Sequence, residues 1–112
     1  MKTAISIGGA ASGKKDDFDE MVAFAVEAAK LGVDQAWSAE AWGYDAVSTL
    51  AYLGARTETM TLGSGIMQIS ARTPSMTAMT ALTMSTITGG RFILGLGASG
   101  PQGVEGLQGQ SF

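Results

Sequence analysis

The sequence predicts an α/β fold built on a parallel sheet. Four short apolar runs of strand length begin at residues 3, 34, 60 and 91, so successive runs start 31, 26 and 31 residues apart. Each interval has room for one helix, and a strand plus helix in about 30 residues is the βαβ unit. Right-handed crossovers then give parallel strands. Both an open doubly wound sheet and part of a (β/α)₈ barrel have this order.

The predicted strands span residues 3–7, 34–38, 60–66 and 91–96, and the first helix follows the first strand. Its apolar residues recur at three- and four-residue spacing, as in an amphipathic helix. Acidic residues gather at its start, where the helix dipole favours them, and Gly32 follows its end. The apolar positions are Phe18, Met21, Val22, Ala25 and Ala29.

The second helix is expected over 45–56, with Asp45 as its N-cap. In the third, Thr73 is the predicted N-cap, Pro74 occupies the first helical position and glycines at 89–90 end it. Its threonine-rich body has a less regular apolar face, formed by Met76, Met79, Leu82, Met84 and Ile87. Residues 98–112 are rich in glycine and are expected to form a loop at the end of a single domain, 1–112.

Composition excludes several classes of function. A chain of 112 residues fits one core, and its net charge of −3 with no basic stripe argues against nucleic-acid binding. Because the chain has no cysteine or histidine, it cannot supply a thiol nucleophile, a Cys/His zinc site or a Ser-His-Asp triad. No stretch approaches the roughly 20 apolar residues of a membrane helix. We expect a cytoplasmic protein with no membrane partner and no metal.

Two glycine-rich motifs resemble nucleotide-binding motifs, but each lacks features that nucleotide binding requires. Residues 8–15 match a P-loop except that Lys15 replaces the hydroxyl that binds Mg²⁺. Acidic residues at 16–20 would also repel a triphosphate, so a βα loop is expected there. Residues 95–100 have the form of a dinucleotide fingerprint, but Pro101 follows them and the chain ends at Phe112.

The ends of three strands carry residues suited to ligand binding. Glycines at 63–65 and 95–97 expose backbone where parallel strands leave the sheet, which is the edge where α/β proteins bind ligands. Glu40 lies between Trp37 and Trp42, and apolar surroundings would raise its pKa for acid–base chemistry. Arg72 follows the third strand and is a candidate for binding an anion, although a lone arginine is also consistent with no role.

Four phrases of the sequence resemble the luciferase-like monooxygenase superfamily, and within it the F420-dependent class. They are residues 37–46 (WSAEAWGYDA), 62–66 (LGSGI), 72–78 (RTPSMTA) and 89–97 (GGRFILGLG). The resemblance implies a (β/α)₈ barrel with F420, or alternatively FMN, at its C-terminal face. It also implies hydride transfer to, or monooxygenation of, a small organic substrate.

The same resemblance suggests the site residues. It places Glu40 as the catalytic residue and implies a non-proline cis peptide at Gly65–Ile66. The residues implied to bind the cofactor are Ser38, Ala39, Ser64, Gly65, Ile66, Gly97, Ala98 and Ser99. Similar sequences often carry a histidine near Gln108.

A complete barrel takes about 250 residues. We therefore expect this chain to be the N-terminal part of one, a half-barrel of about four parallel strands and three helices. Its unpaired edges predict completion by oligomerisation, as a homodimer. Little or no turnover is expected from the short chain, and the alternative is a non-enzymatic structural oligomer without cofactor affinity.

Overall fold

The computed structural model describes residues 1–8 and 11–111. Strands β1 (Ala4–Ile7), β2 (Gln35–Ser38), β3 (Thr61–Ser64) and β5 (Phe92–Ile93) form one four-stranded sheet. All pairings in it are parallel, and the strands lie in the sheet in the same order as in the sequence, β1-β2-β3-β5. The four predicted strands are confirmed, with shorter bounds. The P-loop-like motif includes residues 9 and 10, which lie outside the described residues.

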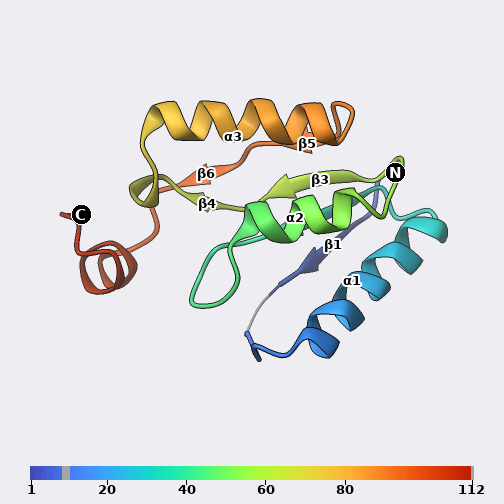
Figure 1. Cartoon of the computed structure of the whole chain (residues 1–112), viewed down its shortest axis with the longest axis horizontal. Helices are drawn as coiled ribbons and strands as arrows, with labels where there is room; N and C mark the ends of the chain where they lie inside the picture. The colour runs from blue at the N-terminus through green and yellow to red at the C-terminus, as the bar shows by residue number, and fades with distance from the viewer. Residues whose placement is uncertain (9–10, 112) are drawn as a thin grey trace.

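The strand order decides between the two architectures that the sequence left open. In a doubly wound sheet the order reverses once, which places helices on both faces. Here the order never reverses, so right-handed crossovers place all three helices on the same face. Figure 1 shows α3 running beside β5 and α2 beside β3. The fold is part of a (β/α) barrel, and the barrel is not closed.

The last two strands of the sheet each break near their ends. After β3 the chain continues into β4 (Met67–Gln68), and after β5 into β6 (Leu96–Gly97). These two short strands pair in parallel as a separate two-stranded sheet. A 3₁₀ turn, η1 (Ile69–Ala71), then leads into the third helix. The predicted strand 60–66 is therefore a strand that stops at Ser64, followed by a turn at Gly65–Ile66.

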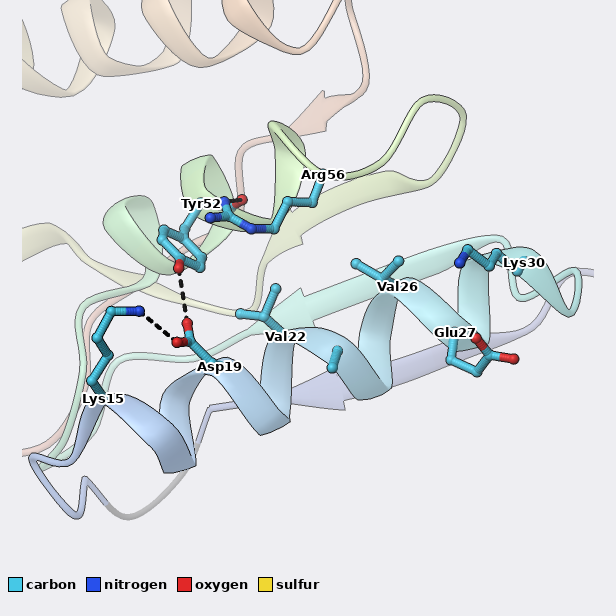
Figure 2. A pocket seen from close by; sticks show the side chains of 9 residues that line it. Lys15, Asp19, Val22, Val26, Glu27, Lys30, Tyr52 and Arg56 are labelled. Carbon is cyan, nitrogen blue, oxygen red and sulfur yellow. Dashed lines mark hydrogen bonds and ion pairs between the residues drawn. The ribbon is translucent and has the colours of Figure 1, made fainter.

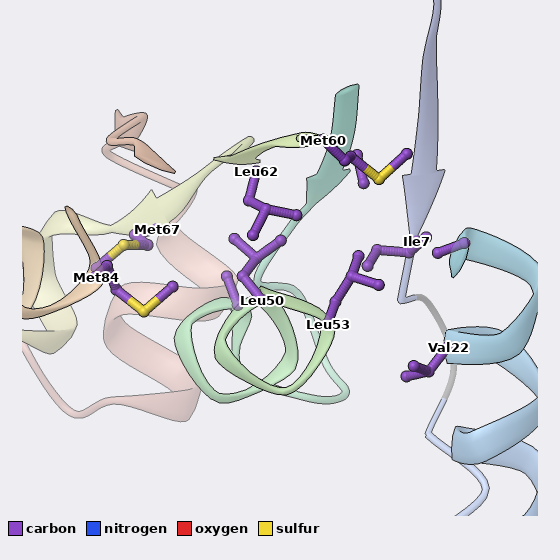
Figure 3. Packing of buried hydrophobic residues seen from close by; sticks show 11 residues of the cluster. Ile7, Val22, Leu50, Leu53, Met60, Leu62, Met67 and Met84 are labelled. Atoms are coloured by element: carbon purple, nitrogen blue, oxygen red, sulfur yellow. The ribbon is translucent and has the colours of Figure 1, made fainter. Parts of the chain in front are cut away.

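The core lies between the sheet and helices α1 (Lys15–Lys30) and α2 (Ala46–Gly54). Alternate strand residues point toward the helices, and Ala36 and Leu62 are completely buried there. Asp45 caps α2 as predicted, because its side chain accepts a hydrogen bond from the Ser48 amide. The side chains labelled in Figure 3 fill this layer: Ile7, Val22, Leu50, Leu53, Met60, Leu62, Met67 and Met84.

Helix α3 (Pro74–Ile87) has the predicted start but not the predicted apolar face. Thr73 accepts a hydrogen bond from the Met76 amide, and Pro74 is the first helical residue. Met84 is the only one of the five predicted inward residues that is buried, whereas Leu82 is 70% exposed. The reason is that α3 itself carries apolar residues on all of its sides, so their pattern does not show which side packs inward. Only a narrow strip of the helix contacts α2 and β5.

The C-terminal residues are more ordered than the sequence predicted. A π-helical segment, η2 (Gln102–Leu107), replaces part of the expected loop 98–112, whose last residue lies outside the described part. The amides of Gly103 and Val104 donate to the Gly100 carbonyl, and Val104 is 2% exposed. Glycines raised the entropic cost of helix formation here, but burial of one valine and these turn hydrogen bonds compensate for it.

Candidate functional site

Three strand ends meet at one edge of the sheet, the side on which η2 lies in Figure 1. The Gly65 amide donates to the Ser38 carbonyl over 2.8 Å, and the Glu40 amide donates to the Ile66 carbonyl over 3.0 Å. These bonds join the end of β2 to the turn after β3. The Gly65–Ile66 peptide is cis, as the family resemblance implied. We call residues 64–66 the β3 tip.

The third strand end joins the β3 tip through a missing side chain. A Cβ at Gly97 would lie 2.7 Å from Cγ1 of Ile66 and 2.8 Å from its Cδ1. The Ile66 side chain therefore occupies the space that a larger residue 97 would need. Gly97 acts as a socket for Ile66, which explains on packing grounds why a glycine stands at the end of β6.

Glu40 is the centre of a polar cluster behind the β3 tip. Its carboxylate accepts two hydrogen bonds from the Arg72 guanidinium, over 2.8 and 2.6 Å, in a bidentate pair. It also accepts from the Ala46 amide at the start of α2 and from the Gln68 amide in β4, both over 3.0 Å. The Glu40 and Arg72 side chains are only 9% and 17% exposed. One carboxylate thus ties together β2, α2, β4 and the turn before α3.

These contacts determine the charge of Glu40. Burial is the largest single effect and raises the pKa of the Glu40 carboxyl, but the hydrogen bonds from Arg72, Gln68 and Ala46 together outweigh it. The net result is a pKa below the usual value, so the expectation of a raised pKa is wrong. Its physical reason is the Arg72 guanidinium, which the sequence did not place beside Glu40. Arg72 is likewise not a free anion site, because its charge is already paired.

Glu40 should give the fold a pH dependence. A group whose pKa is lowered by folding contributes stability above its unfolded pKa, and that stability disappears as the pH falls through the folded pKa. The free energy of unfolding should therefore decrease as the pH is lowered past about 4.5, the ordinary pKa of glutamate. Urea unfolding at a series of pH values measures this, with Glu40→Gln as the control. Parallel curves for the two proteins would contradict the assignment.

Ser64 fills a gap in the backbone pairing at the β3 tip. Its hydroxyl donates to the Gly95 carbonyl and accepts from the Gly95 amide, each over 2.8 Å. The residue is completely buried. One side chain thereby satisfies both backbone groups of Gly95 at the point where the chain changes from β5 to β6. Ser64 shapes the tip, and its hydroxyl points away from solvent.

Replacing Ser64 with alanine should leave the partly buried Gly95 amide without its partner. Such a loss costs about 1–3 kcal/mol of unfolding free energy. Chemical denaturation of Ser64→Ala against wild type tests this, with the exposed Ser85→Ala as a matched control that should change stability little. Equal stability of the two variants would show that the Ser64 bonds contribute nothing.

The predicted cofactor residues divide into two groups. Ser38 and Ser64 are buried, and Ile66 and Gly97 are partly buried, so these residues support the tips from within. Ala39 and Gly65 are exposed, as are the two residues that follow β6, Ala98 and Ser99. Ser99 has a positive φ of 60°, which turns the chain toward η2. The exposed members form the surface that a ligand could touch.

Sequence reasoning missed Gln68 and Ser70 in this region. The side-chain amide of Gln68 donates to the Glu40 carbonyl over 3.2 Å and accepts from the Gln108 side chain. Gln108 in turn accepts from the Ser70 hydroxyl over 2.6 Å. These contacts attach the end of η2 to the cluster around Glu40. The available signal for Gln68 was a polar residue between two apolar ones, two positions after the predicted strand 60–66.

Another hollow lies away from the strand ends. A groove of about 720 Å³ runs between α1 and α2, where Lys15 and Tyr52 both contact Asp19 and the Arg56 guanidinium stacks 3.6 Å from the Tyr52 ring centre (Figure 2). Lys15 and Asp19 form an ion pair, and the other charged side chains of the groove, Glu27, Lys30 and Arg56, are exposed, which is typical of a solvated surface. Among residues 1–8 and 11–111, no cluster of three acidic side chains could hold a metal ion. No helix in the same ranges is long and apolar enough to cross a membrane.

Comparisons with known proteins agree with this geometry. The family model for luciferase-like monooxygenases matches residues 1–112. A protein of Mycobacterium tuberculosis with the provisional name coenzyme F420-dependent oxidoreductase Rv3520c is 46% identical over all 112 residues, which span 31% of its length. The chain thus covers about a third of that relative.

Solved structures share the fold. The FMN complex of the oxygenating constituent of 3,6-diketocamphane monooxygenase from Pseudomonas putida superposes with a TM-score of 0.84 at 20% identity, covering 97% of this chain and 32% of that one. The coenzyme F420-dependent tetrahydromethanopterin reductase of Methanopyrus kandleri gives 0.77 at 24% identity, covering 100% and 31%. With the family match over its whole length, the chain belongs to the luciferase-like monooxygenase family.

Proposed function

We propose that this chain supplies part of the cofactor face of an oxidoreductase that uses F420 or FMN and acts on a small organic molecule. The observation that carries the proposal is the β3 tip. Its residue Gly65 is exposed and has no side chain, and hydrogen bonds join the tip to the end of β2 and, through the Ser64 hydroxyl, to Gly95. Such a rigid, bare backbone suits close approach of a planar ring.

The residues present fit the ring of such a cofactor better than its phosphate. Ala39, Gly65 and Ala98 are exposed and uncharged, so a flat conjugated ring could lie against them without burying a charge. A phosphate needs a free cation or a set of free amides. Arg72, which follows the β3 tip in the sequence, is already paired with Glu40. When bound, the cofactor would supply hydride or activate oxygen, and the chain's residues would position it.

We propose F420 as the cofactor, with FMN as the alternative. The 46% identical relative carries an F420-dependent name, whereas a structural neighbour was solved with FMN. The predicted catalytic role of Glu40 stays a prediction, and its four hydrogen bonds support a positioning role for the same residue. A cytoplasmic location belongs to this proposal as well, since a chain without cysteines suits a reducing compartment.

Fluorescence titration of the purified chain with F420 and, separately, with FMN tests the proposal. We expect saturable binding to one of them, weakened by Gly65→Val, and little or no turnover by the chain alone. Gly106→Val is the matched control, because a Cβ at Gly106 would meet nothing within 4 Å. Absence of binding to either cofactor would overturn the proposal for this chain and favour a structural role without cofactor affinity.

The chain is also proposed to pair with a second copy of itself. Strands β1 and β5 each have one unpaired edge. Residues 73–90, which include α3, contain no charged side chain, so two copies would meet here without repulsion although the chain carries a net charge of −3. Met79 and Leu82 are 60% and 70% exposed on this helix. Light scattering at micromolar concentration should show a dimer that Leu82→Lys weakens, and a monodisperse monomer would contradict it.

A further inference from the structure

A tryptophan lies on the sheet face opposite the helices. The strand register places four residues in one row across the sheet: Ser6, Trp37, Gly63 and Ile93. The adjacent row contains Ala36 and Leu62, which are buried against the helices. Because successive strand residues point to opposite faces, Trp37 and its row face the other side, the interior side of the incomplete barrel.

The Trp37 indole fits only because residue 63 is glycine. A Cβ at Gly63 would lie 2.4, 2.5 and 2.7 Å from three carbons of the indole ring, which is closer than real contacts allow. A Cβ at Gly65 would lie 3.4 Å from Cε3 of the same ring. The indole therefore spans the backbone of β3 from Gly63 to the β3 tip. Its orientation is fixed at the far end, where Nε1 donates to the Gln35 side-chain oxygen over 3.0 Å.

The β3 tip is held from its other sides by contacts already described. The Gly65 amide bonds to Ser38 at the end of β2, the Ile66 carbonyl bonds to Glu40 just beyond it, and the Ile66 side chain sits in the Gly97 socket. None of these contacts blocks movement of Gly65 toward the open sheet face. The indole lies on that face, with Cε3 3.4 Å from the position that a Cβ of Gly65 would occupy, so it limits movement in that direction.

We propose that Trp37 is a positioning residue that sets where the Gly65–Ile66 tip lies. A flat ring is required because the backbone of β3 passes directly over it, and the glycine at 63 leaves the space that the ring occupies. What the tip then contacts rests on the proposed function. The position of the tip itself can be measured without any cofactor.

Amide hydrogen exchange followed by NMR tests this on the apo chain. The amides of Gly65 and Glu40 donate the two hydrogen bonds that join the tips, so their exchange reports local opening. In Trp37→Leu, we expect exchange at both to accelerate at least about tenfold more than at Leu53, a completely buried core residue of α2. A purely structural role in global stability would accelerate all three amides equally, and that result would overturn the proposal.

Two further variants keep the test decisive. Trp42 is 70% exposed, so Trp42→Leu makes the same change without touching the tip and should leave the exchange of Gly65 unaltered. If Trp37→Leu does not fold, Trp37→Phe should show the same local pattern to a smaller extent. Gly63→Ala should open the tip as Trp37→Leu does, since its Cβ must displace the indole. Unchanged Gly65 exchange in both Trp37→Phe and Gly63→Ala would also overturn the proposal.

Cofactor titration of the same variants separates this inference from the proposed function. If wild type binds F420 or FMN, Trp37→Leu should weaken that binding about tenfold. Trp42→Leu, which should leave the exchange of Gly65 unaltered, is the control in the same titration. If wild type binds neither, the proposed function fails for this chain, and the exchange data alone decide whether Trp37 positions the tip. Binding that is unaffected by Trp37→Leu despite an opened tip would remove the link between tip position and cofactor.

Discussion

Replacing Arg72 with methionine is expected to lower the free energy of unfolding by about 3 kcal/mol, because it leaves the buried Glu40 carboxylate without its cation. The pair is bidentate, and both side chains are mostly buried, so solvent does not screen it as at an exposed site. Only the amides of Ala46 and Gln68 would still donate to Glu40. The pKa of Glu40 should rise from its value in the wild type, because the hydrogen bonds and charge of Arg72 that lower it would be gone. Urea denaturation measures the first effect and a carboxyl ¹³C titration the second.

The matched control for Arg72 is Arg56→Met. Arg56 is exposed and stacks on the Tyr52 ring, so the same chemical change there should cost less than about 1 kcal/mol. A double variant, Arg72→Met with Glu40→Gln, should recover part of the loss, because it removes the unpaired charge. If Arg72→Met were no more destabilising than Arg56→Met, the role of the pair in joining the strand ends would be wrong.

Replacing Gly95 with alanine is expected to cost about 3 kcal/mol or more, at the upper end of what overpacking costs. The new Cβ would lie 2.0 Å from the Ser64 carbonyl oxygen, a backbone atom that cannot rotate away. The two strand ends would have to separate, which would also stretch both hydrogen bonds between Ser64 and Gly95. Thermal or urea unfolding gives the size of the effect.

Gly106→Ala provides the control, because a Cβ at Gly106 would meet nothing within 4 Å. Neither glycine has a positive φ, so the comparison isolates space from backbone conformation. We expect the control to change stability by less than about 1 kcal/mol. A Gly95→Ala protein as stable as the control would show that β3 and β5 do not approach each other as closely as described.

The order of elements could be predicted from the sequence because it depends on local patterns. Strand-length apolar runs at regular intervals, an N-cap at Asp45 and the Thr73-Pro74 helix start are each encoded by neighbouring residues, and the structure confirms them. The choice of a barrel arrangement needed the strand order, which pattern alone left open. The family resemblance also identified the Gly65–Ile66 cis peptide correctly.

The state of Glu40 could not be predicted, because it depends on a contact between residues 32 positions apart. Sequence placed aromatic residues beside Glu40 and therefore indicated a raised pKa, but the fold brings Arg72 there instead. The buried face of α3 was also mispredicted, since a helix that is apolar on every side does not reveal which strip packs inward. For η2, the hydrogen bonds at Gly100 and the buried Val104 overcome a sequence that is rich in glycine.

The most direct test of the central claim, that the strand ends form a cofactor surface, is NMR titration of the labelled chain with F420 and with FMN. We predict that amide shifts move first at Ala39, Gly65 and Ala98, the exposed members of the three strand ends. Residues of the groove between α1 and α2, such as Val26, should stay unchanged. Shifts confined to that groove, or no shifts with either cofactor, would contradict the account.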